Sequence, residues 1–213
     1  MFSGGTTASA ANGLAIYNNN GVVDVTNSTF ANHLGDPTDS VVYSHMQYGG
    51  STTITNSILW NDNVAEIGGV DGVGTVTVSY SDVQGGYTGT GNINRDPLFV
   101  NAADSQNGGL ALDIGSPCWD AGEDDNVIGS EDITGAPREV DVPGIGTVDV
   151  PPEETDSVDM GAYEHQYELQ VTVDSLHTAD HTPELIGTVT HPHAGVAVTV
   201  NGNQYLAANN GDG

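Results

Sequence analysis

The sequence predicts an all-β solenoid, in which short strands wind into coils and the coils stack on one another. Three observations lead to this fold class. A pattern of about two dozen residues is written three times between residues 13 and 85, β-branched residues alternate with polar ones inside each copy, and turns rich in Gly and Asn separate the apolar stretches. One such coil cannot bury its own apolar face, whereas stacked coils bury a continuous core.

Within the repeats, three sets of apolar residues correspond at separations of 24 to 29 residues. Because successive residues of a strand point to opposite faces, each set should point inward and stack above its counterparts. The three sets are Ile16, Val42 and Ile67; Val25, Ile54 and Val78; and Phe30, Leu59 and Val83. Asn27 and Asn56 also correspond, at a turn, and we expect their amides to form a short stacked ladder.

Residues 91–166 do not repeat, and we interpret them as a cap on the stack. The segment 92–100 opens this region, and its Asp96-Pro97 step excludes helix because proline restricts the residue before it. The open end of a solenoid exposes unpaired strand edges and apolar interior. We expect this end to be covered by apolar residues of the cap, namely Leu98, Phe99, Leu110, Leu112, Ile114, Trp119 and Tyr163.

The repeats and the cap also carry motifs of a known kind. Residues 25–32, Val-Thr-Asn-Ser-Thr-Phe-Ala-Asn, and 54–61, Ile-Thr-Asn-Ser-Ile-Leu-Trp-Asn, resemble coils of the right-handed parallel β-helix repeat family. Four later motifs follow in the order typical of choice-of-anchor Q domain surface proteins, at residues 91–100, 115–122, 132–138 and 158–164. The resemblance covers about residues 10–165 and implies a right-handed parallel β-helix of about three coils plus a C-terminal cap. One departure from the family pattern is the acidic insert at 139–157.

Residues 167–213 change character and resemble the first half of a bacterial immunoglobulin-like (Ig-like) domain. Alternating apolar stretches occur at 169–174, 182–189, 195–200 and 204–208, and Asn201-Gly202 between the last two is a hairpin signal. A complete sandwich needs about seven strands over ~100 residues, so we expect only a partial Ig-like β-sandwich here. The predicted domains are β-helix coils at 1–90, the cap region at 91–166 and the partial Ig-like domain at 167–213.

The chain is strongly acidic, with 29 Asp and Glu residues, two Arg and a net charge of −27. Such a charge repels nucleic acid phosphates and anionic membranes, so we expect no nucleic acid partner and no direct insertion into a membrane. Because cations are scarce, we expect Arg138 to pair with Asp159 or Glu164, or to clamp the backbone. The first residues do not resemble a signal peptide, and we expect this signal and an anchor to lie elsewhere in a larger extracellular or cell-surface protein.

One constellation has the composition of a metal site. Asp120, Glu123, Asp124 and Asp125 place four carboxylates within six residues of a glycine-containing loop. Calcium takes 6–8 oxygen ligands and such a loop supplies several of them, so calcium is the cofactor that we consider. The spacing does not follow the EF-hand pattern, and a plain solvated loop is the alternative interpretation.

Two classes of function stay open at this point. The first is a non-catalytic structural or adhesion module of a secreted or cell-surface bacterial protein. The second is a fragment of a polysaccharide-degrading enzyme, a lyase or glycoside hydrolase, or a glycan-binding module in which Trp60 and Tyr80 stack on sugars. Such enzymes use carboxylates and basic residues, but no two coil carboxylates fall at matching positions and Arg95 is the only cation near the coils. We therefore expect a non-catalytic module whose partner is an extracellular glycan or another cell-surface component.

Overall fold

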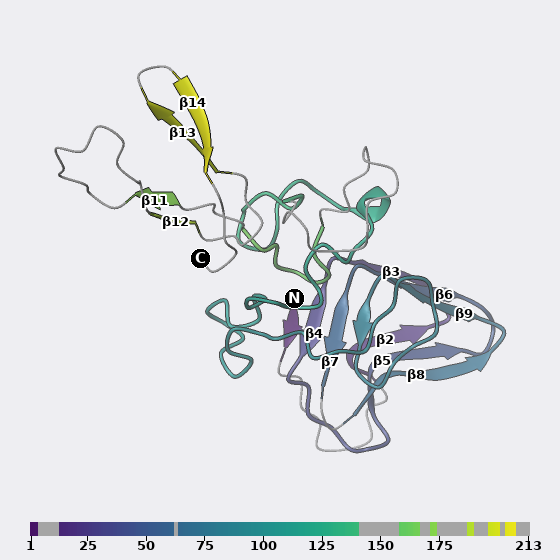
Figure 1. The fold of residues 1–213 in the computed structure, drawn as a ribbon. Helices are drawn as coiled ribbons and strands as arrows, with labels where there is room; N and C mark the ends of the chain where they lie inside the picture. The colour runs from purple at the N-terminus through teal and green to yellow at the C-terminus, as the bar shows by residue number, and fades with distance from the viewer. Residues whose placement is uncertain are drawn as a thin grey trace. The chain divides into compact units, whose positions relative to one another are not determined.

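The computed structural model describes residues 1–3, 13–61, 64–140 and 158–166, and four short strands beyond them at 171–173, 187–189, 196–200 and 203–207. The chain divides into two compact units, Met1–Gln166 and Tyr167–Gly213. The regular secondary structure of the described residues is strand, apart from one single-turn 3₁₀ helix, η1 (Asp124–Asn126). The expectation of an all-β protein is confirmed (Figure 1).

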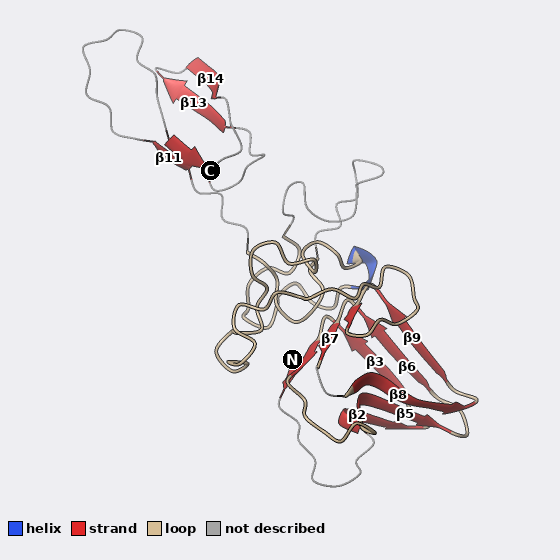
Figure 2. Cartoon of the chain, turned by 60° about the horizontal axis from the view of Figure 1, so that its bottom comes forward, coloured by secondary structure: helices blue, strands red, loops and turns tan. Residues whose placement is uncertain are grey.

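Ten strands of the first unit form three parallel sheets, and each of the three repeats contributes one strand to each sheet (Figures 1 and 2). The first sheet contains β2 (Gly13–Asn19), β5 (Ser40–Met46) and β8 (Ala65–Gly72). The second contains β3 (Val22–Thr26), β6 (Ser51–Thr55) and β9 (Thr75–Ser79). The third contains β1 (Phe2–Ser3), β4 (Thr29–Ala31), β7 (Ile58–Trp60) and β10 (Asp82–Val83). Since neighbouring strands come from successive repeats, the coils stack as in a parallel β-helix.

The register between the coils is the one that the repeats predict. Two of the predicted sets pair from coil to coil without a shift: Val25, Ile54 and Val78, and Phe30, Leu59 and Val83. These six side chains are at most 7 % exposed and belong to one apolar cluster. The third set is also in register, although only Val42 is fully buried while Ile16 and Ile67 pack at the margin of the cluster. The predicted inward stacks are thus confirmed.

The corner between the second and third sheets repeats one backbone conformation in every coil. Asn27, Asn56 and Tyr80 occupy this corner with positive φ angles of 46°, 49° and 46°. Asparagine tolerates this left-handed region better than most residues, so two of the three copies favour a corner there. A serine follows in each coil, and the N–H of one serine donates to the hydroxyl of the serine one coil further on, at 3.2 and 3.1 Å. The corner is therefore a ladder of serine hydroxyls.

The amide ladder expected between Asn27 and Asn56 is not formed, because both side chains bind the cap instead. Oδ1 of Asn56 accepts from the N–H of Glu123 at 2.9 Å, and Nδ2 of Asn56 donates to the carbonyl oxygen of Glu123 at 2.8 Å. Oδ1 of Asn27 accepts from the N–H of Ile128 at 3.4 Å. Asparagines of two different coils therefore hold one segment of the cap, residues 123–128.

The cap begins as a further rung of the stack and then lies along the corner side of the coils. Ile93 forms a parallel bridge with Asp82 of the third coil. Farther along the chain, the N–H of Gly161 donates to the carbonyl oxygen of Asn56 at 2.9 Å. The N–H of Ala162 donates to the hydroxyl of Thr29 at 3.0 Å. The sequence predicts a cap over the end of the stack, but part of it packs on the flank of the first two coils.

The predicted apolar surface of the cap is correct in part. Four of its residues are buried: Leu110, Leu112, Trp119 and Tyr163. Leu98 and Ile114 are 40 % and 82 % exposed, so the prediction is wrong for both. The reason is local: their N–H groups are bound by Asp96 at 3.0 Å and by Asp113 at 2.7 Å, which holds both residues in surface turns.

The second unit contains two antiparallel strand pairs among its described residues. β11 (Val171–Val173) pairs with β12 (Gly187–Val189), and β13 (Val196–Val200) pairs with β14 (Asn203–Ala207). Val200 lies opposite Asn203, as expected for a hairpin around Asn201-Gly202. An Ig-like sandwich built from these pairs stays a prediction. Most of the acidic insert, 141–157, lies outside the described residues.

Ile54 tests the inward stack most directly, because its side chain is fully buried in the middle coil. Ile54→Asp introduces an unpaired buried charge, and we expect it to lower the free energy of unfolding by about 4 kcal/mol or more. Ile54→Val should cost only about 1 kcal/mol. Chemical denaturation measures both. Val22 in β3 is 74 % exposed, and Val22→Asp is the matched control with an expected change below about 0.5 kcal/mol. Equal stability of the two Asp variants would contradict the inward assignment.

Candidate metal centre

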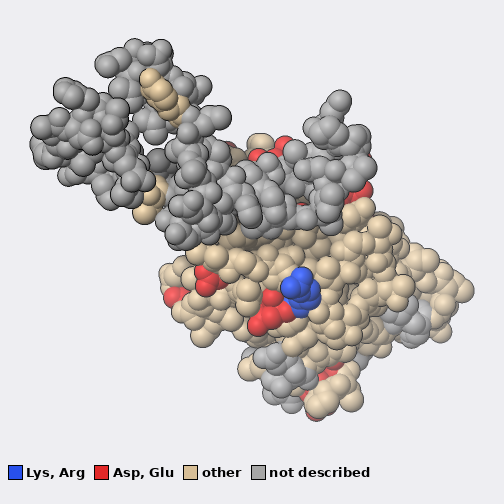
Figure 3. Space-filling view, in the orientation of Figure 1, with Lys and Arg blue, Asp and Glu red and all other residues tan. Residues whose placement is uncertain are grey.

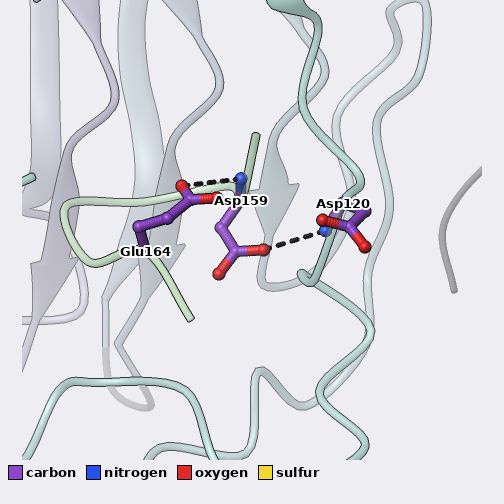
Figure 4. A group of neighbouring side chains, drawn as sticks. All are labelled: Asp120, Asp159 and Glu164. Carbon is purple, nitrogen blue, oxygen red and sulfur yellow. Dashed lines mark hydrogen bonds between the residues drawn. The ribbon is translucent and has the colours of Figure 1, made fainter. Parts of the chain in front are cut away.

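Three buried carboxyl groups meet in the cap. Asp120, Asp159 and Glu164 are 0 %, 0 % and 5 % exposed, and one oxygen from each lies within 4.8 Å of the other two (Figure 4). Asp120 comes from the loop before η1, whereas the other two come from the segment 158–166. The cluster therefore joins two parts of the cap that are distant in the sequence.

Backbone N–H groups hold two of these carboxyl groups in place. Asp159 accepts from the N–H of Asp120 at 2.8 Å and from the N–H of His165 at 2.6 Å. Glu164 accepts from the N–H of Asp159 at 3.1 Å and from the N–H of Val140 at 3.3 Å. Figure 4 shows the first and third of these bonds crossing the cluster. Since a carboxylate offers about four lone pairs, each group keeps capacity for a cation.

The electrostatics of the cluster favour a proton or a cation among its oxygens. Burial raises the pKa of Asp159, and burial together with the charge of Asp159 raises the pKa of Glu164. The positive charge of Arg138 acts against both shifts, but burial prevails. Three negative charges beside a single arginine in a buried site are costly. A divalent cation would supply the compensation in place of a proton, since metal binding to carboxyl groups releases protons.

Arg138 lies beside the cluster but does not form the expected ion pair. Its terminal nitrogens donate to the carbonyl oxygens of Gly161 at 3.3 Å and Ala162 at 3.0 Å. The residue is only 4 % exposed. The backbone clamp is confirmed, and the pairing with Asp159 or Glu164 is not observed. The guanidinium thus holds the segment 158–166 through its carbonyl groups and acts on the carboxyl groups through space.

The four residues predicted as a metal site separate in the structure. Asp120 is buried in the cluster, whereas Glu123, Asp124 and Asp125 lie at η1 and are partly or fully exposed. The carboxylate of Glu123 accepts from Nδ2 of Asn126 at 2.6 Å, a contact within the loop. The described part of the chain therefore contains an Asp/Asp/Glu cluster that could hold a metal ion, and one predicted residue belongs to it.

Asp159 and Glu164 were missed as partners of Asp120 because no local spacing connects them. Asp159 lies 39 residues beyond Asp120, and only the folded cap brings the two together. The scarcity of cations pointed to Asp159 and Glu164 as neighbours of Arg138, which was the one available signal. Calcium takes 6–8 oxygens, so backbone carbonyls or water would have to complete a site on these three carboxylates.

Another buried acid, outside this cluster, joins the third coil to the cap. Asp82 in β10 accepts from the N–H of Arg95 at 3.1 Å and from the thiol of Cys118 at 3.4 Å. Burial raises the pKa of Asp82 to about 6. Burial, together with the charge of Asp82, raises the pKa of the Cys118 thiol. Cys118, the only cysteine, therefore serves as a buried hydrogen-bond donor rather than as a nucleophile.

Comparisons with family models, curated proteins and solved structures found no match to this chain. No helix within the described residues is long and apolar enough to cross a membrane.

We expect Asp82 to make the free energy of unfolding depend on pH, and we expect the variant Asp82→Asn to lack this dependence. Its pKa is raised from 3.8 to about 6 in the folded protein, so the folded state holds the proton more tightly than the unfolded state. The contribution of this residue to the free energy of unfolding is therefore full below pH 4 and falls by about 3 kcal/mol as the pH rises through 6. Urea denaturation of both proteins between pH 4 and pH 8 measures the difference, and a difference independent of pH would refute the shift.

Proposed function

We propose that this chain is a non-catalytic structural or adhesion module of a secreted or cell-surface bacterial protein. The observation that carries the proposal is the unbroken register from β3 through β6 to β9, which bonds every coil to the next. Such a stack is stabilised by each neighbouring coil and provides a regular scaffold. The motifs of the right-handed parallel β-helix repeat family and of the choice-of-anchor Q region support the cell-surface assignment.

The coil carboxylates favour a scaffold over a polysaccharide-degrading enzyme. Glycoside hydrolysis in most families needs two carboxyl groups that flank the bond. Asp24 lies in register with Thr53 of the next coil, which offers only a hydroxyl. Glu66 accepts from the N–H of Asn61 at 2.6 Å and from its amide at 2.9 Å, and Asp82 is bound by Cys118. These three carboxyl groups are not arranged in pairs on an open face.

The net charge of the chain and the strand pairs of the second unit also support this proposal. A net charge of −27 suits an extracellular module and disfavours nucleic acid and anionic membranes as partners. The partner class is an extracellular glycan or another cell-surface component. The antiparallel pairs β11–β12 and β13–β14 support a partial Ig-like domain after the coils. Right-handed winding of the coils belongs to the same proposal, because parallel crossovers are right-handed in nearly all proteins.

The purified chain should release neither reducing ends nor unsaturated sugars from a panel of plant, algal and bacterial polysaccharides. The reason is that Asp24, Glu66 and Asp82, the coil carboxyl groups described above, are not arranged as a catalytic pair. Reducing-sugar and ultraviolet absorbance assays measure the two products, against a mock purification from cells without the gene. Product formation above the mock level would overturn the proposal and identify an enzyme.

We further propose calcium as the ion that the acidic groups of the cap bind. The supporting observation is the convergence of Asp120, Asp159 and Glu164 oxygens within 4.8 Å, because calcium prefers carboxylate oxygens. A native-state ligand stabilises in proportion to the logarithm of its concentration. Calcium should therefore raise the melting temperature by several degrees more than sodium at matched ionic strength.

Two variants distinguish a calcium site at the buried cluster from one at the exposed loop around η1. Asp120→Asn removes one charge from the buried cluster, and the double variant Asp124→Asn, Asp125→Asn removes two from η1. We expect the calcium increment to be lost in the first and retained in the second, measured by differential scanning calorimetry. Loss only in the double variant would assign calcium to the exposed loop. An increment equal in all three proteins, or no calcium-specific increment, would refute a defined site.

A further inference from the structure

A surface cavity of about 380 Å³ opens beside the third sheet, and none of the three residues of the acidic cluster lines it. One wall follows the ends of β4 and β7, and the other is the loop 96–102 that begins the cap. Its volume is at the lower end of the range for small-ligand sites, roughly 300–1,000 Å³. The residues that decide its chemistry are Asn32, His33, Leu34, Trp60, Asp96 and Leu98.

The apolar part of the cavity is built around Trp60. Trp60 is the last residue of β7 and is partly exposed. Leu34 and Leu98 line the same cavity and are 52 % and 40 % exposed. Leu98 has a φ of 53°, a left-handed backbone that a branched side chain rarely adopts, and the Asp96 carboxylate holds it there. The cavity therefore offers an aromatic face with apolar side chains around it.

The polar part of the cavity presents hydrogen-bond acceptors. Nδ2 of Asn32 already donates to the carbonyl oxygen of Ala102 at 2.6 Å, which leaves its Oδ1 as an acceptor. One oxygen of Asp96 accepts from the N–H of Leu98, and the carboxylate keeps a second oxygen. A ligand that fits these groups must donate hydrogen bonds.

His33 also lines the cavity, although it is only 2 % exposed, and its neighbour Asn61 sets its tautomer. Oδ1 of Asn61 accepts from the N–H of His33 at 2.7 Å and lies 3.2 Å from Nδ1 of the ring. Because that oxygen accepts only, Nδ1 carries the ring proton and Nε2 is left as an acceptor. Burial lowers the pKa of His33, which keeps the ring neutral.

We propose that this cavity binds one neutral sugar unit of a glycan, stacked on Trp60, with hydroxyl groups donating to Asn32 and Asp96. A sugar ring combines an apolar C–H face with several donors, which matches an aromatic surface ringed by acceptors. The net charge of −27 disfavours anionic sugars. Arg95 is exposed next to Asp96 in the sequence, and its positive charge disfavours cationic ones. Figure 3 shows a single small basic area beside acidic atoms on an otherwise uncharged face. This inference deepens the proposed module function by naming its partner class and site, and it rests on that function.

The test is calorimetric titration with defined hexasaccharides. The neutral probes are gluco-, manno-, xylo- and galacto-hexasaccharides, and the charged ones are oligogalacturonate and a chitosan hexamer. We expect at least one neutral probe to bind the full chain. Trp60→Leu should weaken that binding more than about tenfold, because aromatic anchors dominate such contacts. Asp96→Asn should weaken it several-fold.

Tyr48→Ala is the matched control, since Tyr48 is an aromatic residue 80 % exposed that does not line the cavity. It should leave binding unchanged. Melting curves check that each variant folds. If Trp60→Leu does not fold, the binding measured with Asp96→Asn decides the test. No binding of any neutral probe, binding that neither variant weakens, or preference for a charged probe would overturn the proposal. Binding followed by cleavage would leave the cavity assignment intact and refute the non-catalytic module. The absence of both binding and cleavage would refute the cavity assignment and leave the non-catalytic module intact.

Discussion

Hydrogen bonding in parallel register from coil to coil is the constraint on which the rest of the structure depends. The longest strand among the described residues has eight residues, and a parallel strand finds its partner only in a neighbouring coil. Once β3, β6 and β9 are in register, Val25, Ile54 and Val78 fall into one buried column. The same register brings the left-handed corners to one side and lets successive serines bond through their hydroxyls. The buried apolar column and the polar corner therefore both result from the repeat of the coils.

The cap solves a charge problem that the composition creates. With 29 acidic residues against two arginines, ion pairs cannot neutralise the carboxylates that are buried. Backbone N–H groups serve instead: Asp159 and Glu164 each accept from two of them. Arg138 is used in the opposite sense, donating to carbonyl oxygens of the same segment. These bonds tie the segment 158–166 to Asp120 and Val140, and the remaining negative charge of the cluster could be balanced by a proton or a metal ion.

The coils could be predicted from the sequence because each coil has the same local pattern of apolar residues, and this pattern occurs three times. The contacts of the cap could not be predicted, because they do not repeat and they join residues that are distant in the sequence. Leu98 looked like core, yet an Asp96 turn places it at the surface. Asp120 lies in the buried cluster, but the sequence grouped it with its neighbours along the chain rather than with Asp159. The serine ladder was missed although Ser28, Ser57 and Ser81 align in the repeats, since hydroxyl groups carry no apolar signal.

The acidic cluster and the proposed sugar-binding cavity are built from different parts of the cap. A change at one of them can therefore leave the other in place. The acidic cluster ties the loop before η1 to the segment 158–166, far along the chain from the loop 96–102. The cavity has one wall from the coils, at the ends of β4 and β7, and one from that loop, joined by the bond from Asn32 to Ala102. Because the coil wall is fixed by the register and the loop wall is not, changes in the loop can alter what is bound without disturbing the stack. Trp60 belongs to the coil wall, where it pairs in register with Ala31. The proposed sugar site therefore has its aromatic residue on a backbone that is fixed before binding, which lowers the entropy lost on association.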